Sequence, residues 1–238
     1  MRFIKVILVF ILAMMAISTS QAQRKNGEVI IVGEMKNVMW KGQLHGSIFL
    51  DTIANKEHLY GFGPVEYLAG EILIVDGIAY KSTVFDDTSM MVEPTYDVEA
   101  PFFAYANIYQ WKEIPLPKEV KSLPQLEAFL HAQTLSVGKP YLFKLSGKAE
   151  KAKIHVVNLP KGARVNTPDD AHLGRKFYEL VNREVDIVGF FSTAHQTVFT
   201  HKDSYLHMHL LTKDKYAMGH LDELQFEQGA MKLYLSLD

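Results

Sequence analysis

Three histidines near the C-terminus have a spacing that could support metal chemistry. His207 and His209 flank Met208 in an apolar run, and His220 follows eleven residues later. In a strand, side chains at i and i+2 project from one face, with their Cα atoms about 6–7 Å apart. Two neutral imidazoles placed in this way can share a zinc ion at about 2.0–2.1 Å. The polar segment 213–215 could turn and bring His220 beside them, and three histidines with an open fourth position are typical of catalytic zinc.

The spacing alone leaves a second interpretation open. The chain has ten histidines in 238 residues, so about 0.4 His-x-His pairs are expected by chance. The three side chains could instead be solvated, or have their hydrogen bonds satisfied inside the core. His195 and His201 are close in sequence, and we expect both to lie in surface loops.

A carboxylate at the start of an apolar segment is the other candidate group. Glu71 follows Gly70 and precedes the run from Ile72 to Val75. By period-two alternation it shares a strand face with Leu73 and Val75. It is either an edge residue that faces water or a functional acid, and the residues alone favour the edge position.

Composition excludes several classes of function. The chain has 25 Lys and Arg against 27 Asp and Glu, and it has no cysteine. A nucleic-acid-binding protein normally has a basic excess, so we expect no nucleic-acid partner. Without cysteine there are no disulfides, no thiolate catalysis and no Cys-ligated zinc. A metal site would therefore have to use His, Asp or Glu.

The first 22 residues predict a cleavable signal peptide. Arg2 and Lys5 precede an uncharged apolar run at residues 6–17, and Ser20 and Ala22 form a small-x-small cleavage site. A membrane span needs about 20 apolar residues, and this run is shorter. Cleavage after Ala22 leaves 238 − 22 = 216 residues. We expect a secreted or periplasmic protein without a membrane span after cleavage.

The remaining chain has the pattern of a strand-rich α+β protein. A hairpin is predicted from residues 71–75 and 78–80, because the Asp76-Gly77 loop suits a type I′ turn. Further strand candidates, rich in β-branched and aromatic residues, are residues 28–32, 141–145, 153–157, 185–191 and 205–211. We expect an N-terminal half, residues 23–135, that carries Glu71 and a C-terminal half, residues 136–238, that carries the histidine site.

Two helices have start signals. Ser122 and Gln125 have the spacing of a capping box, and the apolar positions that follow at helical spacing are Leu126, Phe129 and Leu130. Residues 167–170, Thr-Pro-Asp-Asp, supply an N-cap, a first-turn proline and acids for a second helix. That helix should end near Asn182 with a buried stripe of Leu173, Phe177 and Leu180.

Several segments together resemble the acetolactate decarboxylase family over most of the mature chain. They are the glycine-rich residues 61–77 with Gly70-Glu71 and Asp76-Gly77, Ala100-Pro101-Phe102, residues 141–147, Val188-Gly189-Phe190, and the three histidines with Gly219 and Leu221-Asp222. The histidine group is the most specific, because it is similar to the family's three zinc ligands in both spacing and surroundings.

This resemblance implies two mixed or antiparallel sheets packed with a few helices, and zinc-dependent decarboxylation of 2-acetolactate to acetoin and CO₂. It implies that His207, His209 and His220 bind zinc and that Glu71 is catalytic, at the metal or in proton transfer. Lys144 stands where the family has arginine, and would steer the departing carboxylate or supply a proton. Zinc then replaces an organic cofactor as the electron sink. The resemblance also suggests a homodimer and a small 2-hydroxy-3-keto acid as substrate.

Three departures from the family pattern keep other hypotheses open. Pro64 replaces a threonine, Lys144 lacks the bidentate fork of arginine, and the 18 residues after His220 contain no clear counterpart of the family's tail glutamate. One alternative is an exported, non-catalytic homologue that binds a small acid and a metal. The other is a metal-dependent hydrolase or isomerase of another hydroxy-keto acid. Metal identity also stays open, because imidazole suits copper, nickel and iron as well.

Overall fold

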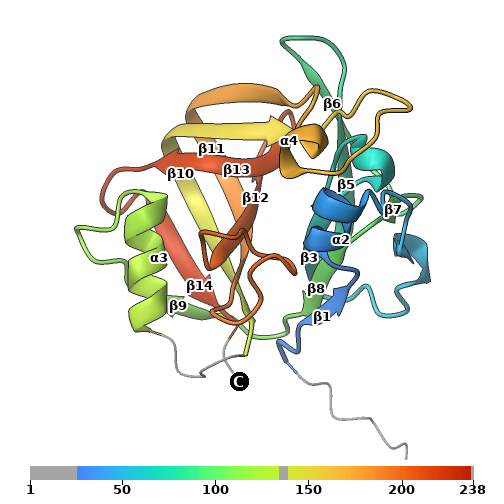
Figure 1. Cartoon of the computed structure of the whole chain (residues 1–238). Helices are drawn as coiled ribbons and strands as arrows, with labels where there is room; N and C mark the ends of the chain where they lie inside the picture. The colour runs from blue at the N-terminus through green and yellow to red at the C-terminus, as the bar shows by residue number, and fades with distance from the viewer. Residues whose placement is uncertain (1–25, 134–138, 237–238) are drawn as a thin grey trace, which may run out of the picture.

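Two six-stranded antiparallel sheets form the body of the protein. The computed structural model describes residues 26–133 and 139–236. In spatial order, the first sheet contains β1 (Ile30–Val32), β8 (Phe103–Asn107), β3 (Leu59–Pro64), β4 (Glu71–Val75), β5 (Ile78–Val84) and β6 (Met90–Pro94). The second contains β11 (Lys176–Phe191), β12 (Leu206–Thr212), β13 (Met218–Gln225), β10 (Tyr141–Val156), β14 (Met231–Leu235) and β9 (Lys112–Ile114). Figure 1 shows the first sheet on the right and the second on the left.

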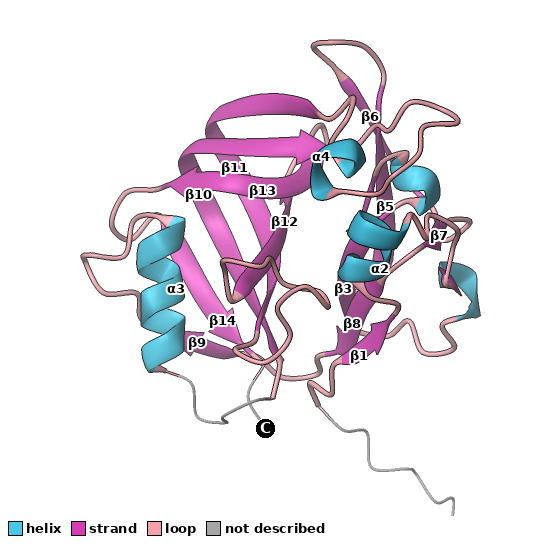
Figure 2. Cartoon of the chain, in the orientation of Figure 1, coloured by secondary structure: helices cyan, strands magenta, loops and turns pink. Residues whose placement is uncertain are grey.

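Several short elements complete the fold. Strands β2 (Ile48–Phe49) and β7 (Glu99–Ala100) form a separate pair. The helices are α2 (Met35–Lys41), α3 (Leu123–Ala132) and α4 (Pro168–Ala171), with the 3₁₀ turns η1 (Leu50–Thr52) and η2 (Glu66–Leu68). In Figure 2 the strands clearly dominate, and α3 lies on the outer side of the second sheet. Across the described ranges, no helix is long and apolar enough to cross a membrane.

The expected strand-rich α+β class with a few helices is confirmed. The hairpin of β4 and β5 turns at Asp76 and Gly77, whose φ values of 48° and 79° are those of a type I′ turn. The strands predicted at 141–145 and 153–157 are two parts of one 16-residue strand, β10. The division at residue 135 remains a prediction, and β9 joins the second sheet from before that point. The predicted signal peptide lies outside the described residues.

The helix predicted after Ser122 is confirmed as α3. Leu126 and Leu130 are buried in the core of the second sheet, at the predicted helical spacing. The Ser122 hydroxyl lies 3.0 Å from Gln125 Oε1, so the two predicted capping residues do interact. The Ser122 side chain accepts no hydrogen bond from the helix backbone, however, and the full capping box does not form.

The second predicted helix, residues 168–182, is wrong. Thr167 does form a capping box with Asp170, but α4 lasts only one turn, and β11 begins at Lys176. Leu173 and Phe177 are 51% and 46% exposed, so the expected buried stripe does not exist. Strand β11 instead pairs with β10 along its whole length, from Val156↔Lys176 to Tyr141↔Phe191. This long-range pairing overrides the local helix signal.

An apolar core joins the two sheets to each other. Phe62 and Leu73 of the first sheet pack in one cluster with Val188, Phe190 and Leu211 of the second. The Phe62 and Phe190 ring centroids are 5.1 Å apart. This packing holds β3 and β4 against β11 and β12, so that residues of both sheets can contribute to one site.

Candidate metal centre

The pairing register of the second sheet places a row of three histidines, His209, His220 and His155, on neighbouring strands. Strands β12 and β13 form the hairpin expected from segment 213–215, and His209 pairs directly with His220. On the other side of β13, His220 pairs with His155 of β10. His207 lies two residues from His209 on β12, on the same strand face. The structure thus brings together His207, His209 and His220, whose ring centroids lie 5.0–5.8 Å apart.

Glu71 approaches this row from the first sheet. It is only 3% exposed at the start of β4, so it is not an edge residue facing water. Its Oε1 accepts a hydrogen bond of 3.2 Å from the backbone N–H of Val157, and its Oε2 lies 3.7 Å from His209 Nε2. Burial raises the pKa of the Glu71 carboxyl well above its usual value. A buried carboxyl group therefore faces the imidazoles.

A hydrogen bond orients the ring of His207, and a carboxylate lies close to the ring of His220. His207 Nδ1 lies 2.6 Å from the carbonyl oxygen of Phe199. Because a carbonyl only accepts, Nδ1 must donate, and Nε2 of the neutral ring keeps its lone pair. His220 Nδ1 lies 3.4 Å from Asp222 Oδ1, and Asp222 also lies 2.9 Å from His155 Nδ1. Metal-ligating histidines usually have such carbonyl or carboxylate partners on the other ring nitrogen.

His201 is an additional member of the cluster that sequence reasoning missed. It lies in the loop between β11 and β12, as expected, but it is packed against His207 and His220 instead of facing solvent. Its Nε2 is 2.8 Å from Nε2 of His220. Ligand nitrogens of His201, His207 and His220 all lie within 4.8 Å of one another. His195 lies apart, hydrogen-bonded to Ser192 Oγ at 2.7 Å.

Burial sets the charge state of the cluster. It lowers the pKa of His207 and His209 well below the usual value, and it lowers the pKa of His201 to about 3 and of His220 to about 4. Burial raises the pKa of Asp222, but hydrogen bonds from His155 and His220 outweigh it and lower that pKa overall. Near neutral pH the site therefore contains uncharged imidazoles, the form that binds metals, beside an ionised carboxylate.

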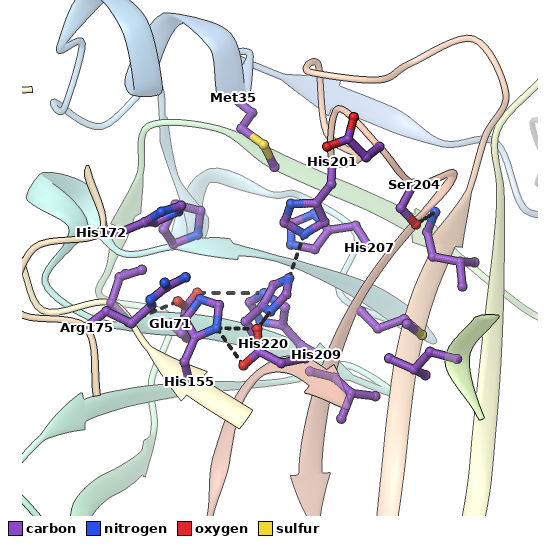
Figure 3. A pocket seen from close by; sticks show the side chains of 18 of the residues that line it. Met35, Glu71, His155, His172, Arg175, His201, Ser204, His207, His209 and His220 are labelled. Atoms are coloured by element: carbon purple, nitrogen blue, oxygen red, sulfur yellow. Dashed lines mark hydrogen bonds and ion pairs between the residues drawn. The ribbon is translucent and has the colours of Figure 1, made fainter. Parts of the chain in front are cut away.

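The cluster forms one wall of a cavity of about 640 Å³. Met35 and Met39 of α2, Glu127 of α3, and His172 and Arg175 after α4 line it together with Glu71 and the histidines. Figure 3 shows His155, His209 and His220 gathered near Glu71, with His201 and His207 above them and Met35 at the opposite side. The cavity is large enough for a small organic acid.

The structure does not place Lys144 in this cavity. Lys144 lies on β10 in a separate depression of about 400 Å³, which Tyr60, Asp186 and Lys213 also line. Its Nζ lies 5.0 Å from the ring centroid of Trp111 and 5.1 Å from that of Tyr234. The lysine therefore contacts aromatic rings instead of Glu71 or the histidine row.

His155 and Asp222 also joined the site without being predicted. Asp222 had a usable signal, because it lies two residues from His220 on one strand face. His155 had none, since its place beside His220 depends on the pairing of β10 with β13, which joins residues 65 positions apart.

The donor set fits a divalent metal such as zinc. It consists of buried neutral imidazoles, of which His207 and His220 have a second ring nitrogen beside a carbonyl or a carboxylate. Two groups of donor atoms lie close together among the described residues: His201, His207 and His220, and His155, His220 and Asp222, which share His220. A centre that uses both His207 and His220 needs a third ligand. His209, on the rigid strand, and His201, in the loop, are the two candidates for the third position.

Comparisons with known proteins agree with this fold. The chain is 25% identical over 199 residues to an alpha-acetolactate decarboxylase of Brevibacillus brevis, which covers 83% of this chain and 66% of the relative. The chain thus spans just under two thirds of that relative's length. Two acetolactate decarboxylase structures share its fold. That of Bacillus subtilis strain 168 has a TM-score of 0.70 at 18% identity, and the alignment covers 88% of this chain and 85% of the other. That of B. subtilis subspecies spizizenii has a TM-score of 0.71 at 19% identity, covering 88% and 86%.

A Staphylococcus aureus protein of unknown function, described as similar to alpha-acetolactate decarboxylase, has a TM-score of 0.70 at 16% identity, covering 87% of this chain and 84% of the other. At these identities the solved structures establish the fold alone. The family itself is established by sequence, because the pattern that defines alpha-acetolactate decarboxylases matches residues 26–236. This match includes Glu71 and every histidine of the cluster, and the chain therefore belongs to the alpha-acetolactate decarboxylase family.

Proposed function

We propose that this protein catalyses metal-dependent decarboxylation of 2-acetolactate to acetoin and CO₂. The observation that carries the proposal is the position of Glu71, which extends from one sheet, fully buried, towards a group of neutral imidazoles on the other. Membership of the family supplies the reaction class. The cavity volume of about 640 Å³ suits a substrate of this size.

The reaction needs an electrophilic group that can accept an electron pair. 2-Acetolactate has its carboxylate on a carbon that also carries a hydroxyl group, next to a ketone, and loss of CO₂ leaves two electrons on that carbon. A zinc ion held at the site would supply a Lewis acid that stabilises this electron pair. His207 and His220 would hold it, with His209 or His201 as the third ligand.

The chain's own residues would position the substrate and move its proton. Glu71 is the acid placed at the imidazoles, and its anchor to the Val157 N–H fixes the carboxyl group in one orientation. It would deliver the proton that the carbon takes up after CO₂ leaves. Asp222 would hold His220 and His155 in place. Met35, Met39 and Phe102 line the cavity and limit access of water to the reacting carbon.

The direct test is an assay of the zinc-loaded protein from residue 23 onward with 2-acetolactate. We expect acetoin above the uncatalysed rate, and a fall of about 10²–10⁴-fold in kcat for Glu71→Gln, which keeps the side-chain shape but removes the proton donor. Glu113→Gln, at the half-exposed Glu113 of β9, is the matched control and should retain activity.

Zinc content measured on the same samples decides how a negative result is interpreted. Absence of acetoin in a protein that carries zinc would contradict the decarboxylase proposal. Binding of the acid without turnover would then support a non-catalytic homologue. Turnover of esters or amides without release of CO₂ would support the hydrolase hypothesis.

A further inference from the structure

The proposed substrate carries a carboxylate, and the cavity must therefore provide a group that recognises it. Among the described residues that line the cavity, Arg175 is the only lysine or arginine. Lys144, which the family resemblance places in this role, lies in the other depression. The inference that follows rests on the proposed function, because it concerns the acid group of that substrate.

Arg175 is held beside the imidazole row by an aromatic ring. It lies between α4 and β11, and its guanidinium carbon is 4.7 Å from the ring centroid of Phe177. The His155 ring packs against the same Phe177 ring, with centroids 5.8 Å apart. His155 in turn contacts His220, with ring centroids 4.4 Å apart. Figure 3 shows Arg175 at the His172 side of the cavity, next to Glu71 and His155.

The charge of Arg175 is available to a ligand. Within the described chain, no carboxylate forms an ion pair with its guanidinium within 4.0 Å. Asp222 is already bound through both oxygens by His155 Nδ1 at 2.9 Å. Arg183, in contrast, lies 3.5 Å from Asp214. The positive charge of Arg175 also contributes to the lowered pKa of His155, His172 and His220, so its field reaches into the cavity.

We propose that Arg175 binds the carboxylate of the substrate and thereby orients the bond that breaks. A planar guanidinium can donate two parallel hydrogen bonds to a carboxylate, which fixes direction as well as position. The interaction is strongest before CO₂ leaves, because the carboxylate loses its charge as the bond breaks. Arg175 is thus a substrate-binding residue whose loss acts mainly on KM.

Steady-state kinetics of matched variants test this assignment. We expect Arg175→Gln to raise KM for 2-acetolactate about 10- to 100-fold while kcat changes less than about 3-fold. The KM of Arg175→Lys should lie between that of Arg175→Gln and that of the original protein. Arg183→Gln is the matched control and should leave both constants unchanged. If Lys144→Gln raises KM and Arg175→Gln does not, the carboxylate is bound by the lysine and the inference is overturned.

A binding measurement separates this inference from the proposed function. 2,3-Dihydroxy-2-methylbutanoate keeps the carboxylate but has no ketone to accept electrons, and butane-2,3-diol has no carboxylate. By calorimetry on the zinc-loaded protein, Arg175→Gln should weaken the dihydroxy acid about 10- to 100-fold and leave the diol unchanged. Equal weakening of both compounds, or failure of the original protein to bind the dihydroxy acid, would contradict a role for Arg175. Absence of acetoin in the original protein would instead contradict only the decarboxylase proposal.

Discussion

The imidazoles of the cluster differ in what fixes each ring. His207 is held by a hydrogen bond to the Phe199 carbonyl, which leaves its Nε2 free for a metal. His220 Nδ1 lies 3.4 Å from Asp222 Oδ1. His209 has a different environment: its ring stacks on Phe62 with centroids 4.4 Å apart, and its Nε2 faces Glu71. His201 reaches His220 from a loop. The third metal ligand is therefore a choice between a ring held on a strand and one carried by a loop.

Single alanine substitutions should resolve this choice. His220→Ala and His209→Ala should each abolish stoichiometric zinc, because both positions are fixed by the pairing of β12 with β13. His201→Ala should keep about one zinc per chain but weaken its affinity about 10- to 100-fold, as loss of an outer partner does. Elemental analysis and chelator competition measure both quantities.

The exposed His45 provides the control, since His45→Ala should bind zinc like the original protein. Full zinc in His209→Ala together with loss of zinc in His201→Ala would contradict the expected set and make His201 the third ligand. Equal metal in all variants would remove the site altogether.

The sequence predicted those site residues that lie close to one another along the chain. His207 and His209 are neighbours on one strand and His220 returns by a short hairpin, so local rules reach these three. For Glu71 the local pattern favoured an edge position, and only the family resemblance assigned it to the site. His155 and Arg175 depend on pairings between distant strands and on packing around Phe177, which no local spacing encodes. Lys144 was assigned through the family resemblance, and only its three-dimensional position separates it from the cavity.

Among the elements, β11 sets the position of the strand that carries His207 and His209. Gly189 of β11 pairs with Met208, while Phe190 pairs with His207 and Val188 with His209. A Cβ atom at Gly189 would overlap the Phe143 ring and would lie 2.7 Å from Met208 Cγ. The glycine therefore leaves room for the Phe143 and Met208 side chains, on the sheet face opposite the one from which the two histidines project.

We expect Gly189→Ala to destabilise the protein by about 1–3 kcal/mol through overpacking, and to weaken zinc binding because Met208 must move with its two neighbours. Denaturant unfolding and chelator competition check the two effects. Gly162→Ala is the comparison: its φ of 82° makes it cost about 1–2 kcal/mol, but no atom lies within 4 Å of the new Cβ, so zinc affinity should be unchanged. Unchanged zinc affinity in Gly189→Ala would show that β12 does not depend on this contact.

Elements with a local cause were predicted better than elements with a distant one. The hairpin at Asp76-Gly77 and helix α3 follow from a turn dipeptide and from apolar spacing within about ten residues. Residues 168–182 have equally good helix signals, but α4 ends at Ala171, and Gly174 then has the left-handed φ of 72°. The edge of β10 offers pairing to the residues from Lys176 onward. The strand therefore wins through contacts that the local sequence does not contain.

At the scale of the whole molecule, the site exists only where the two sheets face each other. Glu71 belongs to the first sheet, whereas His155, His207, His209 and His220 belong to the second. The distance between the acid and the imidazoles is therefore set by how the sheets pack. The sequence predicted a strand-rich protein, but the residues at this interface come from all parts of the chain, and their meeting could not be read from local patterns.

Phe62 is the side chain that makes this dependence testable. It is almost fully buried on β3, and its ring contacts Phe190 at 5.1 Å, His207 at 4.7 Å and His209 at 4.4 Å between centroids. Phe62→Ala should lower the free energy of unfolding by about 3–5 kcal/mol, because it leaves a cavity between the sheets. It should also weaken zinc binding, since His207 and His209 lose the surface that they pack against.

Urea unfolding of the metal-free protein measures the packing cost alone, and the same experiment with zinc adds the effect on the site. Phe85→Ala, at a side chain that is 76% exposed, should change neither quantity. Phe62→Leu restores most of the buried apolar volume, so its free energy of unfolding should be close to that of the original protein. Its zinc affinity should stay lower, because the ring contacts with His207 and His209 are still missing. If Phe62→Ala unfolds like Phe85→Ala, the two sheets do not rely on this contact. The position of Glu71 relative to the histidines must then be fixed elsewhere.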